Sequence, residues 1–415
     1  MKIGIVGCGF VADYYMLTLA NHPALELVGA YDRDPAARER FGRFFGVPMF
    51  DSLEALLAAP GLECVLNLTN PSSHYAVSRT ALLSGCHVYS EKPLAMRVED
   101  AEDLVRLAKE RDLLLAAAPC SYLGEAAQAL GRAIEAGRVG KVRLVYAEME
   151  DGMVFRENHR DWKAPSGAPW PARDEFAVGA TLEHAGYYLS WLCAFFGPVT
   201  EMTAFAARCF DDKGTGQAPG ELANDLSVSC LRFASGVVAR LSCGLAAPKD
   251  RSLHVIGTDG ILSLSEAWDY ASPIYERDVM GHWQSRPKIL GKIVRRVERG
   301  LPLRHWFGRR LTYERGEAKV PGTSSRMDFA RGPAALARAA AAGEPLDFGA
   351  DFALHITELA LVAQNAETYQ MPYRPRSSFA WPAASASAGA QALQDGKGGD
   401  RVGERHDVAA GQAAV

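Results

Sequence analysis

The 415 residues carry a formal net charge of -4, which argues against a strong attraction to nucleic acids or to anionic membrane surfaces. A chain of this length exceeds what one hydrophobic core usually organises, so two domains are expected, and no apolar run is long enough to cross a bilayer. The eight cysteines are scattered without a Cys-x-x-Cys pair, and the N-terminus does not read as a secretory signal, so we expect a cytoplasmic protein without a disulfide scaffold.

The first 120 residues alternate short apolar runs with helical segments. The strand-like runs are KIGIVG, LELVGAYD, CVLNLT, HVYSEKP and LLLAAAP. Strands separated by helices of this length predict right-handed crossovers and a parallel sheet. We therefore expect an α/β fold that begins with a Rossmann-type, doubly wound parallel sheet over residues 1–120. Ligands of such sheets bind beyond the carboxyl ends of the strands.

A glycine pattern, Gly7-x-Gly9-x-x-Ala12, follows the first strand and opens a helix. Gly7 permits a tight turn, Gly9 lets the backbone approach a pyrophosphate, and Ala12 keeps helix and strand close. The first helical residues, Phe10 and Val11, offer free N–H groups and a partial positive charge. Glycines also mark ordinary turns, but the position directly after the first strand predicts a dinucleotide site.

Asp32 ends the second predicted strand, twenty residues after Ala12. A carboxylate there can accept hydrogen bonds from the adenosine ribose hydroxyls and would repel a 2′-phosphate, which predicts NAD. The next residue, Arg33, leaves NADP open, because a guanidinium can bind that phosphate.

The strand that begins at His87 ends in Glu91-Lys92-Pro93. Proline stops the strand and fixes the backbone beyond it. Two charges at the tip of an interior strand need a ligand, a partner or water. A solvated strand end is the alternative to a role in a site.

In Gly7-x-Gly9-x-x-Ala12, Asp32, NLTNPSSHY and SEKPLA the chain resembles the glucose-fructose oxidoreductase / inositol dehydrogenase (Gfo/Idh/MocA) family. The resemblance covers roughly residues 1–370. It implies a second, α+β domain with a large open antiparallel sheet, over residues 121–372, and a homo-oligomer, either a dimer or a tetramer. It also implies a small-molecule carbohydrate substrate. In that family the lysine lies beside nicotinamide and substrate, and the bond before the proline is often cis.

The resemblance implies roles for the charged strand end. Lys92 would bind the reacting oxygen and stabilise the alkoxide that forms. Partial burial would depress its pKa, so that it could also help to move the proton. Glu91 would orient the nicotinamide ribose or amide.

Thr69, Asn70 and His74, from TNPSSHY, should cross the middle of the cofactor. The family usually shows Thr-Pro-Asn-x-x-His, whereas Asn70 and Pro71 stand here in the opposite order. A loop that simply starts a helix, with Ser72 as its cap, is equally compatible.

The family commonly has Asp-x-Gly-x-His on a helix of its second domain. The aligned residues here are His184-Ala185-Gly186-Tyr187-Tyr188, so His184 replaces the aspartate and Tyr188 the histidine. Residues at i and i+4 share a helix face, so we expect both to be catalytic and to bind substrate. The alternative is that the aromatic residues belong to the core. Glu183-His184 lacks a second histidine, so no metal is expected.

A polar and aromatic loop precedes that helix. In it Arg160 and Trp162 are of the types that bind sugar hydroxyls, by charged contacts and by stacking. A surface loop with scattered charges is the alternative. Farther on, DLSVSCLRFASGVVARLSCGLAA alternates in two runs across a turn and predicts a hairpin, and DFALHITELALVAQNAET predicts a helix that packs back onto the nucleotide domain.

Two segments differ in composition from the rest of the chain. Residues 286–310 form a basic insert, which could grip an anionic substrate, a partner or a membrane surface, or could be a solvated amphipathic helix. Residues 373–415 turn to Ala, Ser, Gly and mixed charge and predict a tail without a core.

Taken together, these features predict an NAD(P)-dependent oxidoreductase that moves a hydride between nicotinamide and a sugar, polyol or sugar derivative. Lys92 would polarise the oxygen, and Tyr188 or His184 would complete proton transfer. One alternative is a glycoside-cleaving enzyme that cycles a tightly held NAD. Another is a regulator that binds NAD without catalysis.

Overall fold

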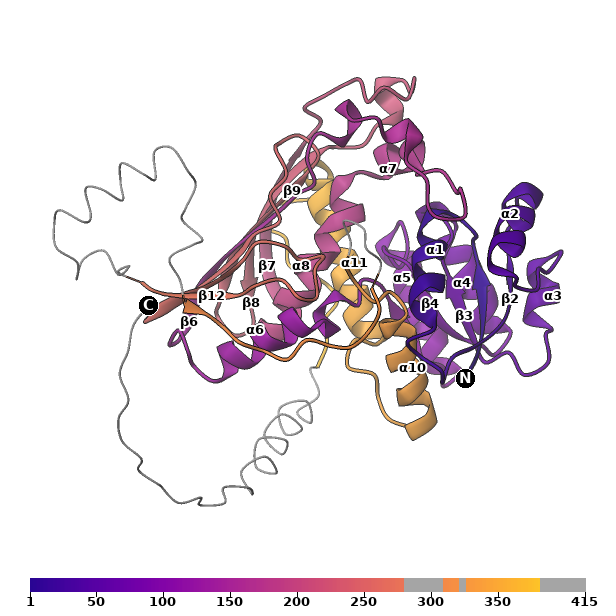
Figure 1. Cartoon of the computed structure of the whole chain (residues 1–415). Coiled ribbons are helices and arrows are strands. Elements are labelled where there is room, and N and C mark those ends of the chain that lie inside the picture. Colours follow the sequence, from indigo (N-terminus) through magenta and orange to yellow (C-terminus); the bar gives the residue numbers. More distant parts are fainter. Residues whose placement is uncertain (280–308, 321–325, 381–415) are drawn as a thin grey trace, which may run out of the picture. The chain divides into compact units, whose positions relative to one another are not determined.

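The computed structural model describes residues 1–279, 309–320 and 326–380, which belong to one compact unit from Met1 to Ala380. Its first part alternates strands and helices as predicted (Figure 1). These are β1 (Lys2–Val6), α1 (Phe10–Leu19), β2 (Glu26–Tyr31), α2 (Pro35–Phe45), α3 (Leu53–Leu57), β3 (Cys64–Asn67), α4 (His74–Leu83), β4 (His87–Ser90), α5 (Val98–Glu110) and β5 (Leu115–Ala117).

The five strands of this part are parallel and run in the order β2-β1-β3-β4-β5. The predicted Rossmann-like sheet is therefore confirmed. Local signals set its helix boundaries: Asp34 accepts a hydrogen bond from Ala36 N (2.9 Å) where α2 begins, and Gly46, with φ +67°, ends that helix. The strand order matters for function, because it places the ends of β2, β1, β3 and β4 side by side along one edge.

The second part is built on a larger sheet. Its elements are α6 (Glu125–Glu135), β6 (Val142–Glu150), α7 (Ala172–Val178), α8 (Ala180–Phe196), β7 (Val199–Ala207), β8 (Leu226–Phe233), β9 (Val238–Gly244), β10 (Leu253–Gly257), β11 (Gly260–Leu264), β12 (Tyr275–Asp278), β13 (Arg309–Arg310), α10 (Arg331–Ala342) and α11 (Ala350–Gln364). Eight strands pair in the order β13-β12-β11-β10-β6-β9-β8-β7. Only β6 and β9 pair in parallel among these described strands, which confirms a large, mostly antiparallel sheet.

The predicted hairpin is β8–β9, whose turn contains Gly236 at φ +82°. Every second residue of these strands is buried, among them Leu231, Phe233 and Leu241. This alternation is what one covered sheet face produces. Helix α8 supplies the cover, because it contacts both β8 and β9.

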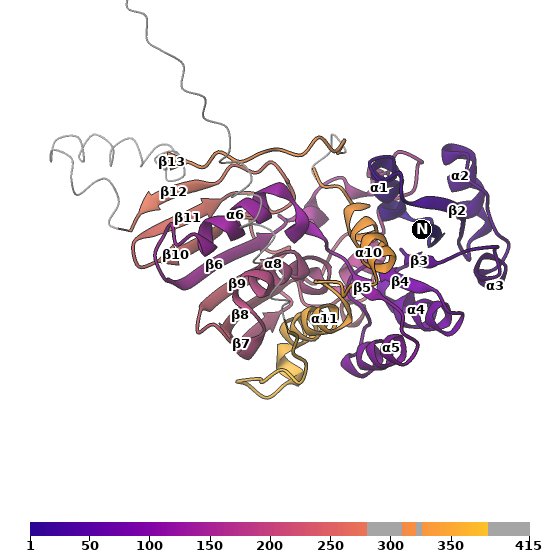
Figure 2. The ribbon, with the colours of Figure 1, turned by 90° about the horizontal axis from the view of Figure 1, so that it is seen from below.

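Helix α11 joins the two parts. It packs against α8 on one side and against α5 and β5 on the other, as Figure 2 shows for α11 and α5. Ala353 and Leu354 of α11 belong to the same buried cluster as Val88 and Leu104 of the first part. The predicted return of this segment to the nucleotide domain is confirmed.

The segment that follows α11 corrects one expectation. Residues 373–380 were predicted to begin a coreless tail, yet Tyr373 pairs with Met202, and Glu358 accepts a hydrogen bond from the Tyr373 hydroxyl (2.6 Å). The phenyl ring of Phe379 packs against that of Phe352, with 5.0 Å between centroids. Composition alone predicts that this segment has no core, but a buried carboxylate can still anchor it by accepting hydrogen bonds from its polar groups. Residues 286–308 of the basic insert and 381–415 lie outside the described residues, and the boundary at residue 120 stays a prediction.

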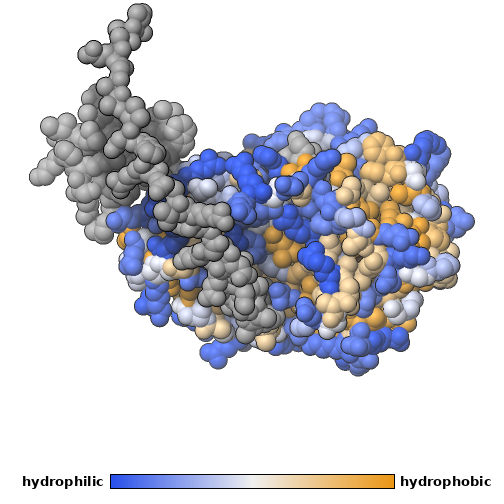
Figure 3. Space-filling view, turned by 60° about the horizontal axis from the view of Figure 1, so that its bottom comes forward, coloured by the Kyte–Doolittle hydropathy of each residue, from blue (hydrophilic) through white to orange (hydrophobic). Residues whose placement is uncertain are grey.

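On the face that Figure 3 shows, hydrophilic residues cover much of the surface and apolar residues gather in separate patches. Large exposed apolar side chains include Leu17, Phe44 and Phe205, on α1, α2 and β7.

Within the described parts of the chain, none of the helices combines the length and the apolar character that a membrane crossing requires.

Candidate active site

The turn between β1 and α1 has the form that a pyrophosphate requires. Gly7 has φ +98°, and a Cβ on it would lie 2.6 Å from the Leu68 carbonyl, so only glycine fits. At Gly9 a Cβ would meet nothing within 4 Å, which leaves room beside the backbone. No side chain caps the N-terminus of α1, where Phe10 and Val11 begin the helix, so its N–H groups remain available to an anion.

Asp32 lies on the same edge, directly after β2. Its Oδ2 accepts a hydrogen bond from Cys8 N (2.7 Å) and its Oδ1 from Asp34 N (2.8 Å). Arg38 donates to the Asp32 carbonyl oxygen (2.7 Å), while Arg33 is exposed. These bonds fix the carboxylate next to the glycine turn.

The loop after β3 is held by buried side chains. Thr69 donates its hydroxyl to Asn67 Oδ1 (2.7 Å). Of the His74 ring, Nδ1 lies 2.6 Å from the Pro93 carbonyl oxygen and Nε2 lies 2.9 Å from that of Thr69. Burial lowers the pKa of His74, while the hydrogen bonds to the carbonyl oxygens of Pro93 and Thr69 act in the opposite direction. His74 therefore links two loops of the site, while Asn70 reaches toward Asp174 of α7 (3.5 Å).

The Glu91-Lys92-Pro93 segment follows β4, and the Lys92–Pro93 bond is cis, as the family resemblance implied. Glu91 is buried and accepts a hydrogen bond from the Tyr15 hydroxyl of α1 (2.7 Å). Its other oxygen accepts from Lys92 N (3.2 Å). Glu91 thus joins the strand end to the dinucleotide-binding helix.

Lys92 meets the second part of the molecule at Glu183, in the first turn of α8. The ammonium and this carboxylate form an ion pair, with side chains that are 19% and 6% exposed. Burial acts to lower the pKa of Lys92, but the charges of Glu183, Glu91 and Glu175 outweigh it and raise the pKa above its ordinary value. The predicted depression of this pKa is therefore wrong, because carboxylates from distant segments converge on the amine.

Glu175, on α7, is the least expected member of the site. Burial and the neighbouring Glu183 carboxylate raise its pKa, while the Lys92 charge acts in the opposite direction. Carboxyl groups that share a site do not all ionise together, so one of them is positioned to hold a proton.

Tyr187 lies one helical turn after Glu183 and therefore on the same face of α8. Burial raises the pKa of Tyr187, against the effect of the Lys92 charge. Its ring packs on Trp268, with 5.2 Å between centroids. The hydroxyl is therefore a neutral donor in the neighbourhood of Lys92.

The structure brings His184 near the lysine but not Tyr188. His184 packs on Trp268 (5.4 Å), and burial together with the Lys92 charge lowers its pKa to about 3, so it is neutral. Tyr188 is fully buried, and its hydroxyl donates to the Arg251 carbonyl oxygen. The acidic charges that act on Tyr188 come from Glu266, Asp250 and Glu148. The i, i+4 pair near Lys92 is thus Glu183 and Tyr187, one residue earlier than the sequence alignment indicates, with His184 beside it.

The two loop residues expected to bind substrate make contacts elsewhere. Arg160 is exposed and donates to the Gly214 carbonyl oxygen. Trp162 packs on Trp170 (5.2 Å) in a small apolar cluster around Phe176. The exposed Arg160 fits the alternative of a surface loop, whereas Trp162 belongs to an apolar cluster, and neither contact supports a role in substrate binding.

A network behind the site was missed by sequence reasoning. Arg251 forms ion pairs with Asp151 and Glu266, and its guanidinium lies 3.4 Å from the centre of the Trp268 ring. Trp268 in turn supports His184 and Tyr187. No spacing rule connects these residues, since they come from separate strands and loops.

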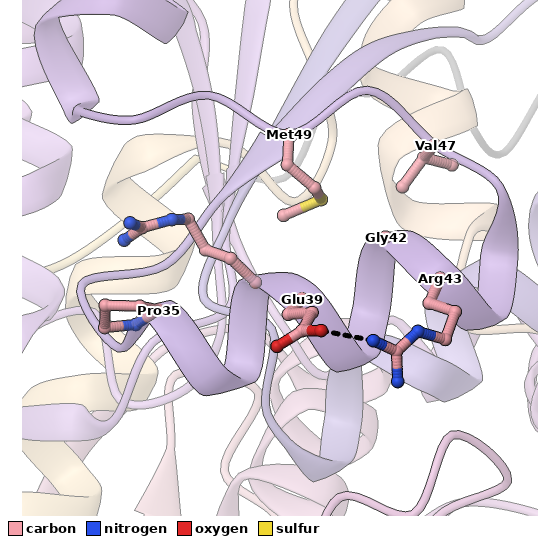
Figure 4. Close-up of a pocket in the computed structure, with 7 residues that line it drawn as sticks. Pro35, Glu39, Gly42, Arg43, Val47 and Met49 are labelled. Atoms are coloured by element: carbon pink, nitrogen blue, oxygen red, sulfur yellow. Dashed lines mark hydrogen bonds and ion pairs between the residues drawn. The ribbon is translucent and has the colours of Figure 1, made fainter.

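Cavities alone do not mark this site. A hollow of about 430 Å³ lies along α2, where Glu39 and Arg43 form an ion pair beneath Met49 (Figure 4). A much smaller cavity of about 20 Å³ borders Lys92 between α8 and α11. Of the described side chains that line this cavity, Lys92 alone is charged, so we place the site by the carboxylates that converge on Lys92 and not by either cavity. Among the described residues, no group of His, Cys, Asp and Glu side chains is arranged to hold a metal ion.

Comparison with known proteins identifies both parts of the chain. Residues 1–118 match the "Oxidoreductase family, NAD-binding Rossmann fold", and residues 127–263 match the "GFO/IDH/MocA C-terminal domain". The D-apiose dehydrogenase of Paraburkholderia graminis is 27% identical over 288 residues, which are 67% of this chain and 70% of that protein.

Two solved structures share the fold. The UDP-N-acetylglucosamine 3-dehydrogenase of Acidithiobacillus ferrooxidans is similar with a TM-score of 0.64 at 18% identity, over 88% of this chain and 97% of that one. A 3-ketoreductase from Actinomadura kijaniata, in complex with TDP-benzene and NADP, has a TM-score of 0.64 at 19% identity, over the same shares. Both domains, in this order and on these residues, establish that the chain belongs to the Gfo/Idh/MocA family of NAD(P)-binding oxidoreductases.

Proposed function

We propose that the protein is an NAD-dependent dehydrogenase or reductase that acts on a CH–OH group of a sugar, polyol or sugar derivative. The observation that carries this proposal is the Lys92–Glu183 ion pair next to the dinucleotide-binding edge of the sheet. The names of the relatives refer to a sugar and to nucleotide-sugar chemistry, which supports the substrate class.

The residues present fit a nicotinamide dinucleotide. The open space at Gly9 and the uncapped start of α1 would hold the pyrophosphate, and Asp32 would bind the adenosine ribose. A carboxylate at this point disfavours a 2′-phosphate, so NAD is proposed over NADP. The bound cofactor supplies the hydride donor or acceptor.

The chain's own groups would manage the charge and the proton on the substrate oxygen. Because its pKa is raised, Lys92 stays an ammonium and donates a hydrogen bond to that oxygen, which stabilises an alkoxide. Glu183, beside Nζ, is placed to take the proton that leaves the hydroxyl or to return it in reduction. Tyr187 would orient the same oxygen by donating its hydroxyl hydrogen.

The test combines cofactor binding with turnover. The purified protein is denatured and analysed for released nicotinamide cofactor, and a panel of sugars and polyols is then screened at the absorbance band of the reduced cofactor. We expect turnover by the wild type, a loss of about a hundredfold or more in Lys92→Met, and nearly unchanged cofactor affinity in that variant.

Other outcomes decide against the proposal. Glycoside cleavage with retained cofactor and no net reduction would indicate the redox-cycling enzyme. Cofactor binding without either activity would indicate the regulator. Unchanged turnover in Lys92→Met would remove the lysine from the mechanism.

A further inference from the structure

A hairpin of the second part of the chain contacts the dinucleotide-binding helix. Lys163 and Pro169 pair at its base, and Ala164 N donates to the Ala168 carbonyl oxygen (2.8 Å) within it. We call residues 163–169 the Ser166 hairpin. In Figure 1 the loop that precedes α7 reaches the end of α1 that follows the glycine turn.

The contact itself is specific. Ser166 donates its backbone N–H to Asp13 Oδ2 (2.6 Å) and its hydroxyl to Asp13 Oδ1 (2.9 Å). Asp13 lies in the first turn of α1 and is 0% exposed. A buried carboxylate needs such partners, so the hairpin and the helix start depend on each other.

A second residue supports the same arrangement from α2. Arg40 donates to the carbonyl oxygen of Cys8 (2.8 Å), which lies between the two glycines of the turn. Its side chain also borders the hairpin, because a Cβ on Gly167 would lie 4.0 Å from Arg40 Cδ. The base of the hairpin rests on the Trp162–Trp170 contact of the second part.

These contacts leave the phosphate position free. Asp13 lies one helical turn beyond Gly9, where a Cβ would meet nothing within 4 Å. The hairpin therefore stands beside the open end of the helix and does not fill it.

We propose that the Ser166 hairpin is a clamp over the bound dinucleotide, and that the Ser166–Asp13 contact sets the rate at which the cofactor leaves. The inference rests on the dinucleotide site of the proposed function. Ser166 and Asp13 act as positioning residues: they hold a wall from the second part of the chain against the pyrophosphate-binding turn.

The test measures the dissociation rate of NADH. Bound NADH is displaced by excess NAD in a stopped-flow instrument, and the loss of nicotinamide fluorescence is followed. The variants are Ser166→Ala, Asp13→Asn and the double variant, with Ser84→Ala as the matched control, since its hydroxyl donates to the Thr80 carbonyl oxygen on the exposed end of α4 (3.0 Å).

We expect each single variant to release NADH about tenfold faster, because each weakens hydrogen bonds to a charged group. The double variant should be no faster than the faster single variant, because the two residues act through one contact. Thermal unfolding midpoints close to that of the wild type would exclude general destabilisation as the cause. Ser84→Ala should match the wild type.

Asp13→Asn gives the sharper result. Removal of a negative charge near phosphate should by itself strengthen binding, so faster release can come only from the lost clamp. Slower release in Asp13→Asn, unchanged release in Ser166→Ala, or independent effects that multiply in the double variant would each overturn the inference. Faster release in the variants without sugar turnover by the wild type would refute the proposed function alone, and a wild type that binds neither NADH nor NADPH would overturn both.

Discussion

Lys92 carries an ordinary amine, and its surroundings decide what it can do. Sequence reasoning located it, because Glu-Lys-Pro at a strand end is a specific local pattern. The same reasoning gave the wrong direction for its pKa. Glu175 and Glu183 lie more than eighty residues away in the chain, and no local pattern shows that they approach the amine.

The raised pKa of Lys92 predicts a pH dependence. Because the pKa of Lys92 is raised in the folded protein, the stability that the ion pair contributes is fully present below the ordinary pKa of 10.5. This stability is lost only as the pH rises through the higher pKa of the folded state. In Glu183→Gln the burial remains while the strongest raising charge is gone, so the pKa of Lys92 should fall. The wild type should keep its kcat/KM up to pH 11, whereas in Glu183→Gln kcat/KM should fall off within that range. Because the same change removes the proposed acid–base group, kcat/KM of this variant should also be lower at every pH.

Profiles of kcat/KM between pH 6 and pH 11 check this expectation. Glu110→Gln, at the exposed end of α5, serves as the control and should keep the wild-type profile. A Glu183→Gln profile without an alkaline limb below pH 11 would contradict the role given to that carboxylate.

The adjacent tyrosines of α8 should respond differently to loss of the hydroxyl. Tyr187→Phe keeps the ring on Trp268 but removes a donor near Lys92, so kcat/KM should fall by about tenfold to a hundredfold with little change in stability. Tyr188→Phe leaves the buried Arg251 carbonyl without its partner and should lower the free energy of unfolding by about 1–3 kcal/mol. Kinetics and denaturant unfolding of both variants separate the two effects. The reverse pattern would restore Tyr188 as the catalytic tyrosine.

At the scale of elements, helix phase explains why the site was only partly predicted. The spacing i, i+4 pairs His184 with Tyr188 and equally pairs Glu183 with Tyr187. Helix α8 is buried on most sides, so its apolar pattern does not show which face meets Lys92. The rotation of α8 about its own axis selects the second pair, and that rotation depends on tertiary packing.

Strand β6 ends in a carboxylate whose burial affects stability. Burial, with the nearby Glu148 and Asp250 charges, raises the pKa of Glu150 from 4.5 to about 7. The folded protein therefore keeps a proton that the unfolded chain loses, and the free energy of unfolding falls as the pH rises between these values. Glu150→Gln should be more stable than the wild type by about 2 kcal/mol at pH 8 and no more stable at pH 4.5. Urea unfolding at both pH values measures this, and an equal difference at both would contradict it.

At the scale of the whole molecule, alternation of strand and helix signals was enough to predict the parallel sheet, and residue alternation was enough to predict the β8–β9 hairpin. Contacts between distant segments were not predictable in this way. The Ser166–Asp13 contact and the return of Tyr373 to Met202 join residues whose local sequence carries no sign of a partner.

One buried carboxylate anchors the segment that follows α11. Glu358 is 0% exposed and accepts hydrogen bonds from the Tyr373 hydroxyl (2.6 Å), Arg376 N (2.8 Å) and Ser377 N (2.9 Å). In Glu358→Gln an NH₂ group, which donates hydrogen bonds, replaces one carboxylate oxygen and faces groups that are themselves donors. The free energy of unfolding should therefore fall by about 2–3 kcal/mol. Calorimetry, with limited proteolysis of residues 373–380, tests this against Glu344→Gln, a change at an exposed residue just after α10. Equal stability of the two variants would show that Glu358 does not anchor the segment.

The main chain around Lys92 is fastened from several directions. Glu91 N donates to the Asn67 carbonyl oxygen (2.8 Å), and Leu94 N donates to the Thr357 hydroxyl of α11 (3.1 Å). A molecule that competes with Glu183 for the ammonium must therefore turn the flexible methylene stem of the lysine while the backbone stays where it is. Exchange of partners at Nζ then needs bond rotations of a single side chain and no rearrangement of the strand end that carries it.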